Sequence, residues 1–172
     1  MAESTGSGSC RTLLIVYHTM TGGTLQMANA AAAGARNESE VQVRLLHASG
    51  AGPPDVLAAD GFVFATPENL GAMSGGLKDF FDRCYYPALD RLAGRPYASL
   101  ICAGNEGQNA ARQIERIAIG WRLKPIAQAL IVCTHAQTPQ QILREKKIGR
   151  KDLGRCRELG AAIAAGLALG VF

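Results

Sequence analysis

Five short apolar runs, separated by longer stretches with helical periodicity, constrain the fold of this 172-residue chain more than any other feature. The run TLLIVY at 12–17 is continuously apolar, which is typical of a strand buried on both faces of a sheet. The run VQVRLL at 41–46 alternates more, so we expect it nearer an edge. The other three strands are predicted at 60–66, 97–103 and 127–133.

Helices are predicted in the segments between these runs. An alanine-rich segment predicts a helix at 24–36, and apolar stripes predict others from Gly75 and at 109–122. The last helix is expected at about 152–169, with Asp152 as its N-cap. Strands and helices that alternate in this way indicate an α/β fold with a doubly wound, five-stranded parallel sheet.

The segment between the fifth strand and the last helix, 134–150, is an irregular insertion. Thr138 as N-cap and Pro139 in the first turn predict a short helix within it. Seven basic residues crowd the range 144–157, and an anion-attracting face and a solvated face are both open readings. We favour the solvated face, and no nucleic-acid partner, because no aromatic residues interleave with these charges.

Length and composition indicate one domain at 12–172, preceded by a disordered leader at 1–11 that is rich in Ser, Thr and Gly. No apolar run approaches the roughly 20 residues that span a bilayer, and the start lacks the layout of a secretory signal. We therefore expect a cytoplasmic protein with no membrane partner. The five cysteines form no C-x-x-C pair, so no metal site is predicted.

The most unusual loop is HTMTGGT, which follows the first strand. Its threonines offer hydroxyl donors, and its two glycines let backbone N–H groups approach an anion closely. The helix that follows directs its partially positive end to the same place. Neither a P-loop nor a G-x-G-x-x-G fingerprint is present. A capped glycine turn is the alternative, but the spacing favours a phosphate site at Thr19, Met20, Thr21, Gly22, Gly23 and Thr24.

Two further loops follow the third and fourth strands, at the sheet edge where such folds bind ligands. The loop TPENLGAMSGG could bring backbone amides to a planar heterocycle, or it could be only a surface loop before a helix. The loop CAGNEGQN could close the other side of the same pocket, although Asn/Gly turns before helices are common. His18, at the end of the first strand, is read as a structural hydrogen-bonding residue.

These motifs resemble the flavodoxin-like superfamily over nearly all of 12–169. T-x-T-G-x-T at 19–24 is similar to its flavin mononucleotide (FMN) phosphate loop, and 66–83 is similar to the second flavin loop of its NAD(P)H-dependent oxidoreductases. The resemblance implies strand order 2-1-3-4-5 and FMN as cofactor. It also implies that three loops hold the flavin: 19–24 at the phosphate; Thr66, Pro67, Glu68, Asn69, Leu70, Gly71 and Met73 along the ring system; and Gly104, Asn105 and Gly107 at its far edge.

In such proteins the chemistry belongs largely to the cofactor, so no catalytic residue is assigned. The resemblance implies an oxidoreductase that takes hydride from NAD(P)H as co-substrate and reduces a small quinone-like acceptor, and it leaves homo-oligomers open. Electron-carrier flavodoxins are usually acidic and sandwich the ring between aromatic residues. This chain has a pI near 8.9 and no aromatic residue at 66–75 or 103–109, which favours an enzyme. An electron-transfer flavodoxin and a flavin-free binding module are the alternatives.

Overall fold

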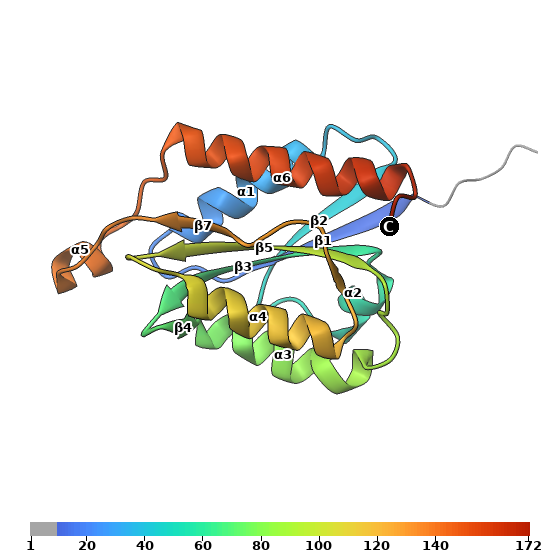
Figure 1. The fold of residues 1–172 in the computed structure, drawn as a ribbon, viewed down its shortest axis with the longest axis horizontal. Helices are drawn as coiled ribbons and strands as arrows, with labels where there is room; N and C mark the ends of the chain where they lie inside the picture. Colours follow the sequence, from blue (N-terminus) through green and yellow to red (C-terminus); the bar gives the residue numbers. More distant parts are fainter. Residues whose placement is uncertain (1–9) are drawn as a thin grey trace, which may run out of the picture.

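The computed structural model describes residues 10–172, and its centre is one sheet of parallel main strands (Figure 1). The main strands are β1 (Arg11–Tyr17), β2 (Val41–His47), β3 (Gly61–Asn69), β5 (Pro96–Ala103) and β7 (Leu130–Cys133). They lie in the order β2-β1-β3-β5, and β7 pairs with the outer side of β5. The predicted doubly wound sheet and its strand order are confirmed.

Two very short strands complete the sheet. β6 (Lys124–Pro125) pairs with the start of β5, and β7 pairs with its end, so together they form one interrupted edge strand. β4 (Ala72–Met73) pairs antiparallel with the end of β3. The predicted run 127–133 is therefore longer than the strand that forms, because only residues from Leu130 onward pair with β5.

Helices cover both faces of the sheet (Figure 1). Helices α1 (Gly23–Ala35) and α6 (Arg150–Ala168) pack on one face, and α2 (Pro53–Ala58), α3 (Gly75–Ala88) and α4 (Gln108–Gly120) pack on the other. The central strand β1 contributes Leu14 and Val16 to one core and Leu13 and Ile15 to the other. This explains why its sequence is apolar without alternation.

Helix α5 (Pro139–Leu143) lies in the connection between β7 and α6, residues 134–149, which we call the β7–α6 connection. Thr138 caps α5 as predicted, and its hydroxyl accepts from Gln141 N at 3.3 Å. The predicted cap of the last helix is wrong. Gly149 is the N-cap of α6, and Asp152 lies in its first turn, paired with Arg155 at 3.1 Å. The helix therefore begins two residues earlier than expected.

The predicted leader at 1–11 falls mainly on residues 1–9, which lie outside the described residues, and β1 begins at Arg11. No helix within residues 10–172 is both long and apolar enough to cross a membrane.

Helices α1 and α6 approach each other through glycines. A Cβ on Gly34 of α1 would lie 2.0 Å from Arg157 O, and a Cβ on Gly160 of α6 would lie 2.0 Å from Ala31 O. The alanine-rich sequence of α1 has the same basis, because Ala28, Ala31 and Ala32 are fully buried against α6 and the sheet. Close backbone approach of this kind fixes the position of α6 along α1.

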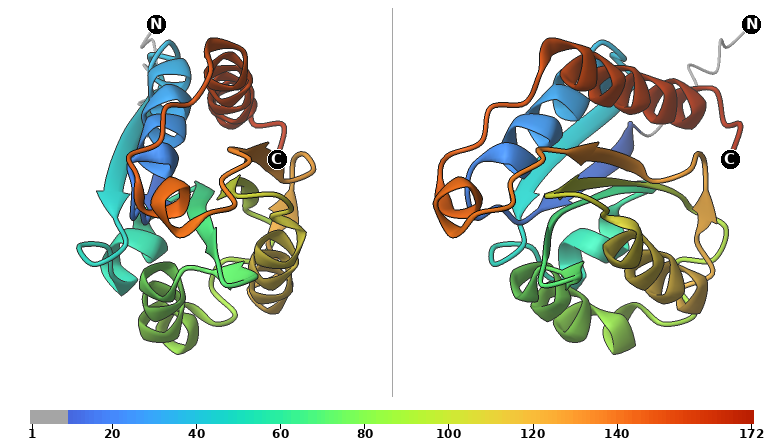
Figure 2. Two further views of the ribbon diagram at one scale, coloured as in Figure 1. Left: turned by 90° about the vertical axis from the view of Figure 1, so that its left-hand side faces the viewer. Right: turned by 60° about the vertical axis from the view of Figure 1, so that its left-hand side comes forward.

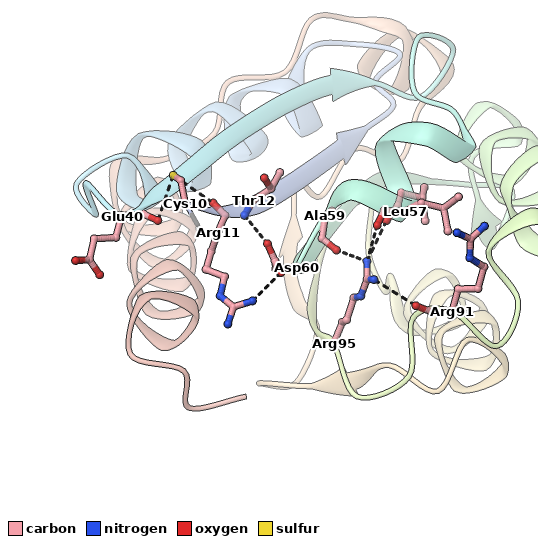
Figure 3. A network of polar contacts seen from close by, with 10 residues as sticks. Cys10, Arg11, Thr12, Glu40, Leu57, Ala59, Asp60, Arg91 and Arg95 are labelled. Carbon is pink, nitrogen blue, oxygen red and sulfur yellow. Dashed lines mark hydrogen bonds and ion pairs between the residues drawn. The ribbon is translucent and has the colours of Figure 1, made fainter. Parts of the chain in front are cut away.

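Polar contacts close the end of the sheet where the strands begin (Figure 3). Asp60 accepts from Thr12 N at 2.8 Å and pairs with Arg11 at 3.0 Å. Arg95 donates to the carbonyl oxygens of Leu57, at 3.0 Å, and Ala59, which closes the C-terminal end of α2. The donors and acceptors of this network bind one another, so we assign it a structural role.

Candidate functional site

Three loops meet at the opposite end of the sheet, where β1, β3 and β5 finish (Figure 2). Asn69 Nδ2 donates to Met20 Sδ at 2.9 Å, which joins the loop after β1 to the loop after β3. Glu68 Oε1 accepts from Gly107 N at 3.0 Å, which joins the loop after β3 to the loop after β5. The structure thus brings the three predicted loops together, as expected for the carboxyl ends of parallel strands.

The first loop, 19–24, leaves hydrogen-bond donors free at the start of α1. The cap residue Gly22 has a φ of 82° and no side chain to offer. Within residues 10–172, the N–H groups of Gly23, Thr24 and Leu25 find no acceptor. Helices usually satisfy these first-turn donors with a capping side chain, with water or with a ligand. The free donors and the helix dipole together suit an anion.

Thr24 adds a hydroxyl group to the same place. Its side chain is 1% exposed, and Thr24 Oγ1 makes no hydrogen bond of normal geometry, although it lies close enough to the Cys102 thiol to favour the thiolate slightly. A buried hydroxyl without a partner is unusual in a native protein, because its desolvation goes uncompensated. The donor set therefore fits the phosphate group of the predicted cofactor. The loop itself carries no charged side chain, although Glu145 lies beside Gly22 and Lys146 lies beside Gly23.

The Cys102 thiol packs directly against Gly23 in this loop. A Cβ on Gly23 would lie 2.7 Å from Cys102 Sγ, so only glycine fits above it. Burial raises the pKa of the Cys102 thiol to about 11, against the smaller opposite effects of Lys146 and of the Thr24 hydroxyl. The thiol is therefore neutral at pH 7 and adds no negative charge beneath the candidate phosphate site.

The second predicted loop is a β-hairpin rather than an irregular loop. Its turn residues, Leu70 and Gly71, both have positive φ, 50° and 70°. Asn69 pairs with Ala72 across this two-residue turn, which is the geometry of a type I′ hairpin. Thr66 is fully buried, and its hydroxyl accepts from Ser74 N at 3.0 Å. Thr66 thus holds the base of the hairpin, while Pro67 and Asn69 are half-buried above it.

Glu68 holds the third loop to the hairpin. Its carboxylate accepts from the N–H groups of Gly107 and Ala110, at 3.0 and 3.3 Å, and so satisfies the N-terminal end of α4. Gly107, the N-cap of α4, has a φ of 82°. Gly104 and Asn105 lie on the loop between the end of β5 and Gly107, and Asn105 is exposed. Both carboxylate oxygens of Glu68 already accept a hydrogen bond within the protein. A flavin contact by Glu68 stays a prediction.

The surface between these loops is apolar in part and open. Leu70 at the tip of the hairpin is fully exposed, Met20 is 64% exposed, and Met73 is buried behind the hairpin. Met73 N donates to Gln113 Oε1 of α4 at 2.9 Å, which fixes the second strand of the hairpin. The hairpin therefore presents an apolar tip on a rigid support.

His18 lies beside this edge, packed against the start of α3. A Cβ on Gly76 would lie 2.4 Å from its ring. Its Nδ1 is buried without a hydrogen-bond partner, so the predicted structural hydrogen bond is not seen at that atom. Burial lowers the pKa of His18, and the neighbouring ring of His47, centred 5.4 Å away, lowers it further.

The sequence did not indicate that the β7–α6 connection would contact the first loop. Lys146 N donates to Thr21 O at 2.8 Å, and Gln26 Nε2 donates to Lys146 O at 2.7 Å. Ile148 N donates to Gln26 Oε1 at 3.1 Å. Figure 2 shows this connection, in orange, running along the N-terminal end of α1. These residues are separated by about 120 positions, and no local pattern marks them as partners.

A cavity of about 570 Å³ opens between the end of β7 and the β7–α6 connection. Its lining includes Thr134, His135, Arg144, Lys147 and Asp152, and none of the predicted cofactor residues. It adjoins the third loop, because His135 N donates to Gly104 O at 2.8 Å. The three predicted loops thus form an open edge, and this half-open cavity lies beside them.

Comparison with known proteins gives two kinds of likeness. A sequence model of the family described as NADPH-dependent FMN reductase matches residues 53–137, which include the second and third loops. A protein named flavodoxin from Aquifex aeolicus is 44% identical over 91 residues, which cover 53% of this chain and 47% of the relative. An NAD(P)H dehydrogenase (quinone) from Acidithiobacillus ferrooxidans is 33% identical over 91 residues, covering 41% and 46%. The chain spans about half the length of these relatives.

Solved structures share the fold across almost the whole chain. A flavodoxin from the domain Archaea superposes with a TM-score of 0.71 at 19% identity, covering 91% of this chain and 98% of that one. A flavodoxin, WrbA-like protein from Agrobacterium tumefaciens gives a TM-score of 0.69 at 20% identity, covering 93% and 98%. At these identities the likeness describes the fold alone.

Proposed function

We propose that this chain, which has a flavodoxin-like fold and matches the NADPH-dependent FMN reductase model over residues 53–137, binds FMN at the carboxyl ends of β1, β3 and β5 and acts as an NAD(P)H-dependent oxidoreductase. The observation that carries this proposal is the unused donor set at the start of α1. It consists of three first-turn N–H groups and the buried, unpartnered hydroxyl of Thr24. The match to the NADPH-dependent FMN reductase family supports the choice of reaction.

Each loop has its own task in this proposal. The N–H groups of Gly23 and Thr24 and the Thr24 hydroxyl hold the phosphate. The hairpin at 66–73 lies along the ring system, with Leu70 and Met20 as its apolar contacts. The loop at 104–107 closes the far edge, and Glu68 fixes it in place through Gly107. When bound, FMN supplies the redox chemistry by accepting hydride from a nicotinamide and passing electrons to an acceptor.

The open edge supports the enzymatic alternative. No aromatic residue occurs in 66–75 or 103–109, so these loops offer no aromatic side chain to stack on either face of the ring system. The chain's own residues would then position the cofactor and leave one face accessible to a nicotinamide and to a small quinone-like acceptor. Positioning of two reactants in contact is a large part of what such a protein contributes to the rate.

The absorption spectrum of the purified protein tests FMN binding directly. We expect a yellow protein, or a colourless one that becomes yellow with added FMN, and NADH or NADPH oxidation when a quinone is present. Thr21→Glu should abolish flavin retention, because it places a negative charge beside the phosphate. Asn37→Glu, exposed just beyond the far end of α1, is the matched control and should retain the flavin. A wild-type protein that takes up no FMN contradicts the proposal.

The identity with the Aquifex aeolicus flavodoxin supports a second candidate, an electron carrier between partner proteins. The two functions differ in one measurement on the FMN-loaded protein. An oxidoreductase should oxidise NADH or NADPH steadily with a quinone, whereas a carrier should do so only when a separate reductase is added. A flavin-free binding module would differ from both by its lack of flavin absorption after incubation with FMN.

A further inference from the structure

Gln26 links the first loop to a distant part of the chain. Its Nε2 donates both to Gly22 O, at 3.0 Å, and to Lys146 O, at 2.7 Å, while its Oε1 accepts from Ile148 N at 3.1 Å. The side-chain amide thus binds a backbone carbonyl and a backbone N–H group of the β7–α6 connection, as the backbone of a neighbouring strand would. All of these distances lie in the normal range for hydrogen bonds.

The contact orients the peptide group between Gly22 and Gly23. Gly22 O accepts from Gln26 Nε2 and from Gln26 N, at 3.0 and 3.2 Å. In a planar trans peptide, C=O and N–H point in opposite directions. The Gly23 N–H therefore points away from Gln26, and it is one of the free donors at the start of α1. The preceding peptide is fixed in a similar way, because Thr21 O accepts from Lys146 N and Gly22 N donates to Thr19 Oγ1.

The β7–α6 connection is itself held in place where it meets the loop. Lys146 Nζ donates to the carbonyl oxygens of Gln141, Ile142 and Arg144, at 2.7–2.8 Å. Ile148 is 8% exposed and packs in the core formed by α1, α6 and the sheet. Lys146 Cβ and Ile148 Cδ1 also lie 3.2 and 3.5 Å from where a Cβ on Gly23 would be. The connection is therefore a wall of the first loop.

We infer that Gln26 is a positioning residue for phosphate binding, and that residues 145–148 are a structural part of the phosphate site. This inference rests on the proposed FMN site and adds that an anion at the first loop and the order of the connection stabilise each other. Loss of the Gln26 side-chain amide leaves the Gly22–Gly23 peptide held only by the bond from Gln26 N to Gly22 O, and it releases the connection. Reciprocity of this kind follows from thermodynamic linkage.

The test compares FMN with riboflavin, which carries the same ring system without the phosphate. Gln26→Met keeps the length of the side chain and removes its hydrogen bonds. We expect it to lower FMN affinity about tenfold, because a hydrogen bond to a charged group is weakened, and to leave riboflavin affinity unchanged. Gln113→Met is the matched control: it removes the acceptor for Met73 N in the hairpin and should lower both affinities by the same factor. An equal loss of both affinities in Gln26→Met overturns the inference.

Hydrogen exchange with inorganic phosphate gives a measurement that is independent of flavin. Phosphate should slow exchange of the Gly23 and Lys146 amides in the wild-type protein, and less so in Gln26→Met. If Gln26→Met does not fold, Gln26→Asn, whose shorter amide cannot span both partners, takes its place with the same expectations. Phosphate that protects neither amide in the wild type overturns the inference. A wild type that binds neither flavin but is protected by phosphate overturns the proposed function alone.

Discussion

At the scale of single residues, the Thr24 hydroxyl separates ligand binding from folding. Thr24→Val removes an unpartnered buried hydroxyl, so we expect the free energy of unfolding without ligand to stay the same or to rise slightly. FMN affinity should fall about 10- to 100-fold, the range for a lost hydrogen bond to a charged group. Flavin fluorescence titration and thermal unfolding measure the two effects.

Thr66→Val is the control for this change. Thr66 is equally buried, but its hydroxyl has partners in Pro67 O and Ser74 N, at 2.9 and 3.0 Å. Its removal should lower the free energy of unfolding by about 1–3 kcal/mol. Equal destabilisation by the two substitutions would mean that the Thr24 hydroxyl has a partner within the protein.

His18 predicts a pH dependence at the same scale. Its pKa in the folded protein is lowered by burial and by His47, so the unfolded chain binds more protons below its ordinary pKa of about 6.5. Stability should therefore fall as the pH drops from 7 to 5. His18→Gln should show a shallower fall in urea unfolding curves measured across this range. Identical slopes for the two proteins would assign the pH dependence to other groups.

At the scale of elements, the contact between α1 and α6 depends on glycine. Gly160→Ala should lower the free energy of unfolding by roughly 1–3 kcal/mol despite the better helix propensity of alanine, because its Cβ would lie 2.0 Å from Ala31 O. Gly154→Ala, in the same helix, meets nothing within 4 Å and should stabilise by about 0.5–1 kcal/mol. Chemical denaturation of both variants measures the difference, and stabilisation by Gly160→Ala would contradict the close approach.

Local patterns account for most elements, and they fail where contacts are distant in sequence. The apolar run of β1 and the stripe of α3 predicted their positions, because burial on a sheet or helix face repeats locally. The pairing of Glu68 with Gly107, and of Gln26 with Lys146, left no such pattern, because each joins residues 39 or more positions apart. For the same reason the sequence did not indicate that Glu68 binds the N-terminal end of α4.

At the scale of the whole molecule, FMN should stabilise the fold. A ligand at about 100 times its dissociation constant adds about 2.7 kcal/mol to the free energy of unfolding. For a domain of this size that raises the Tm by about 5–10 °C. Riboflavin at the same multiple of its own dissociation constant should give an equal shift, and differential scanning fluorimetry measures both. A Tm that stays constant with FMN would count against a flavin site.

The contact between the first loop and the β7–α6 connection has a consequence for biosynthesis. The ribosome makes Thr21 and Gln26 early, but Lys146 and Ile148 follow about 120 residues later. A nascent chain that carries β1 and α1 therefore has the loop sequence without one of its walls. A phosphate site of the proposed kind would therefore be complete only after synthesis has passed Ile148.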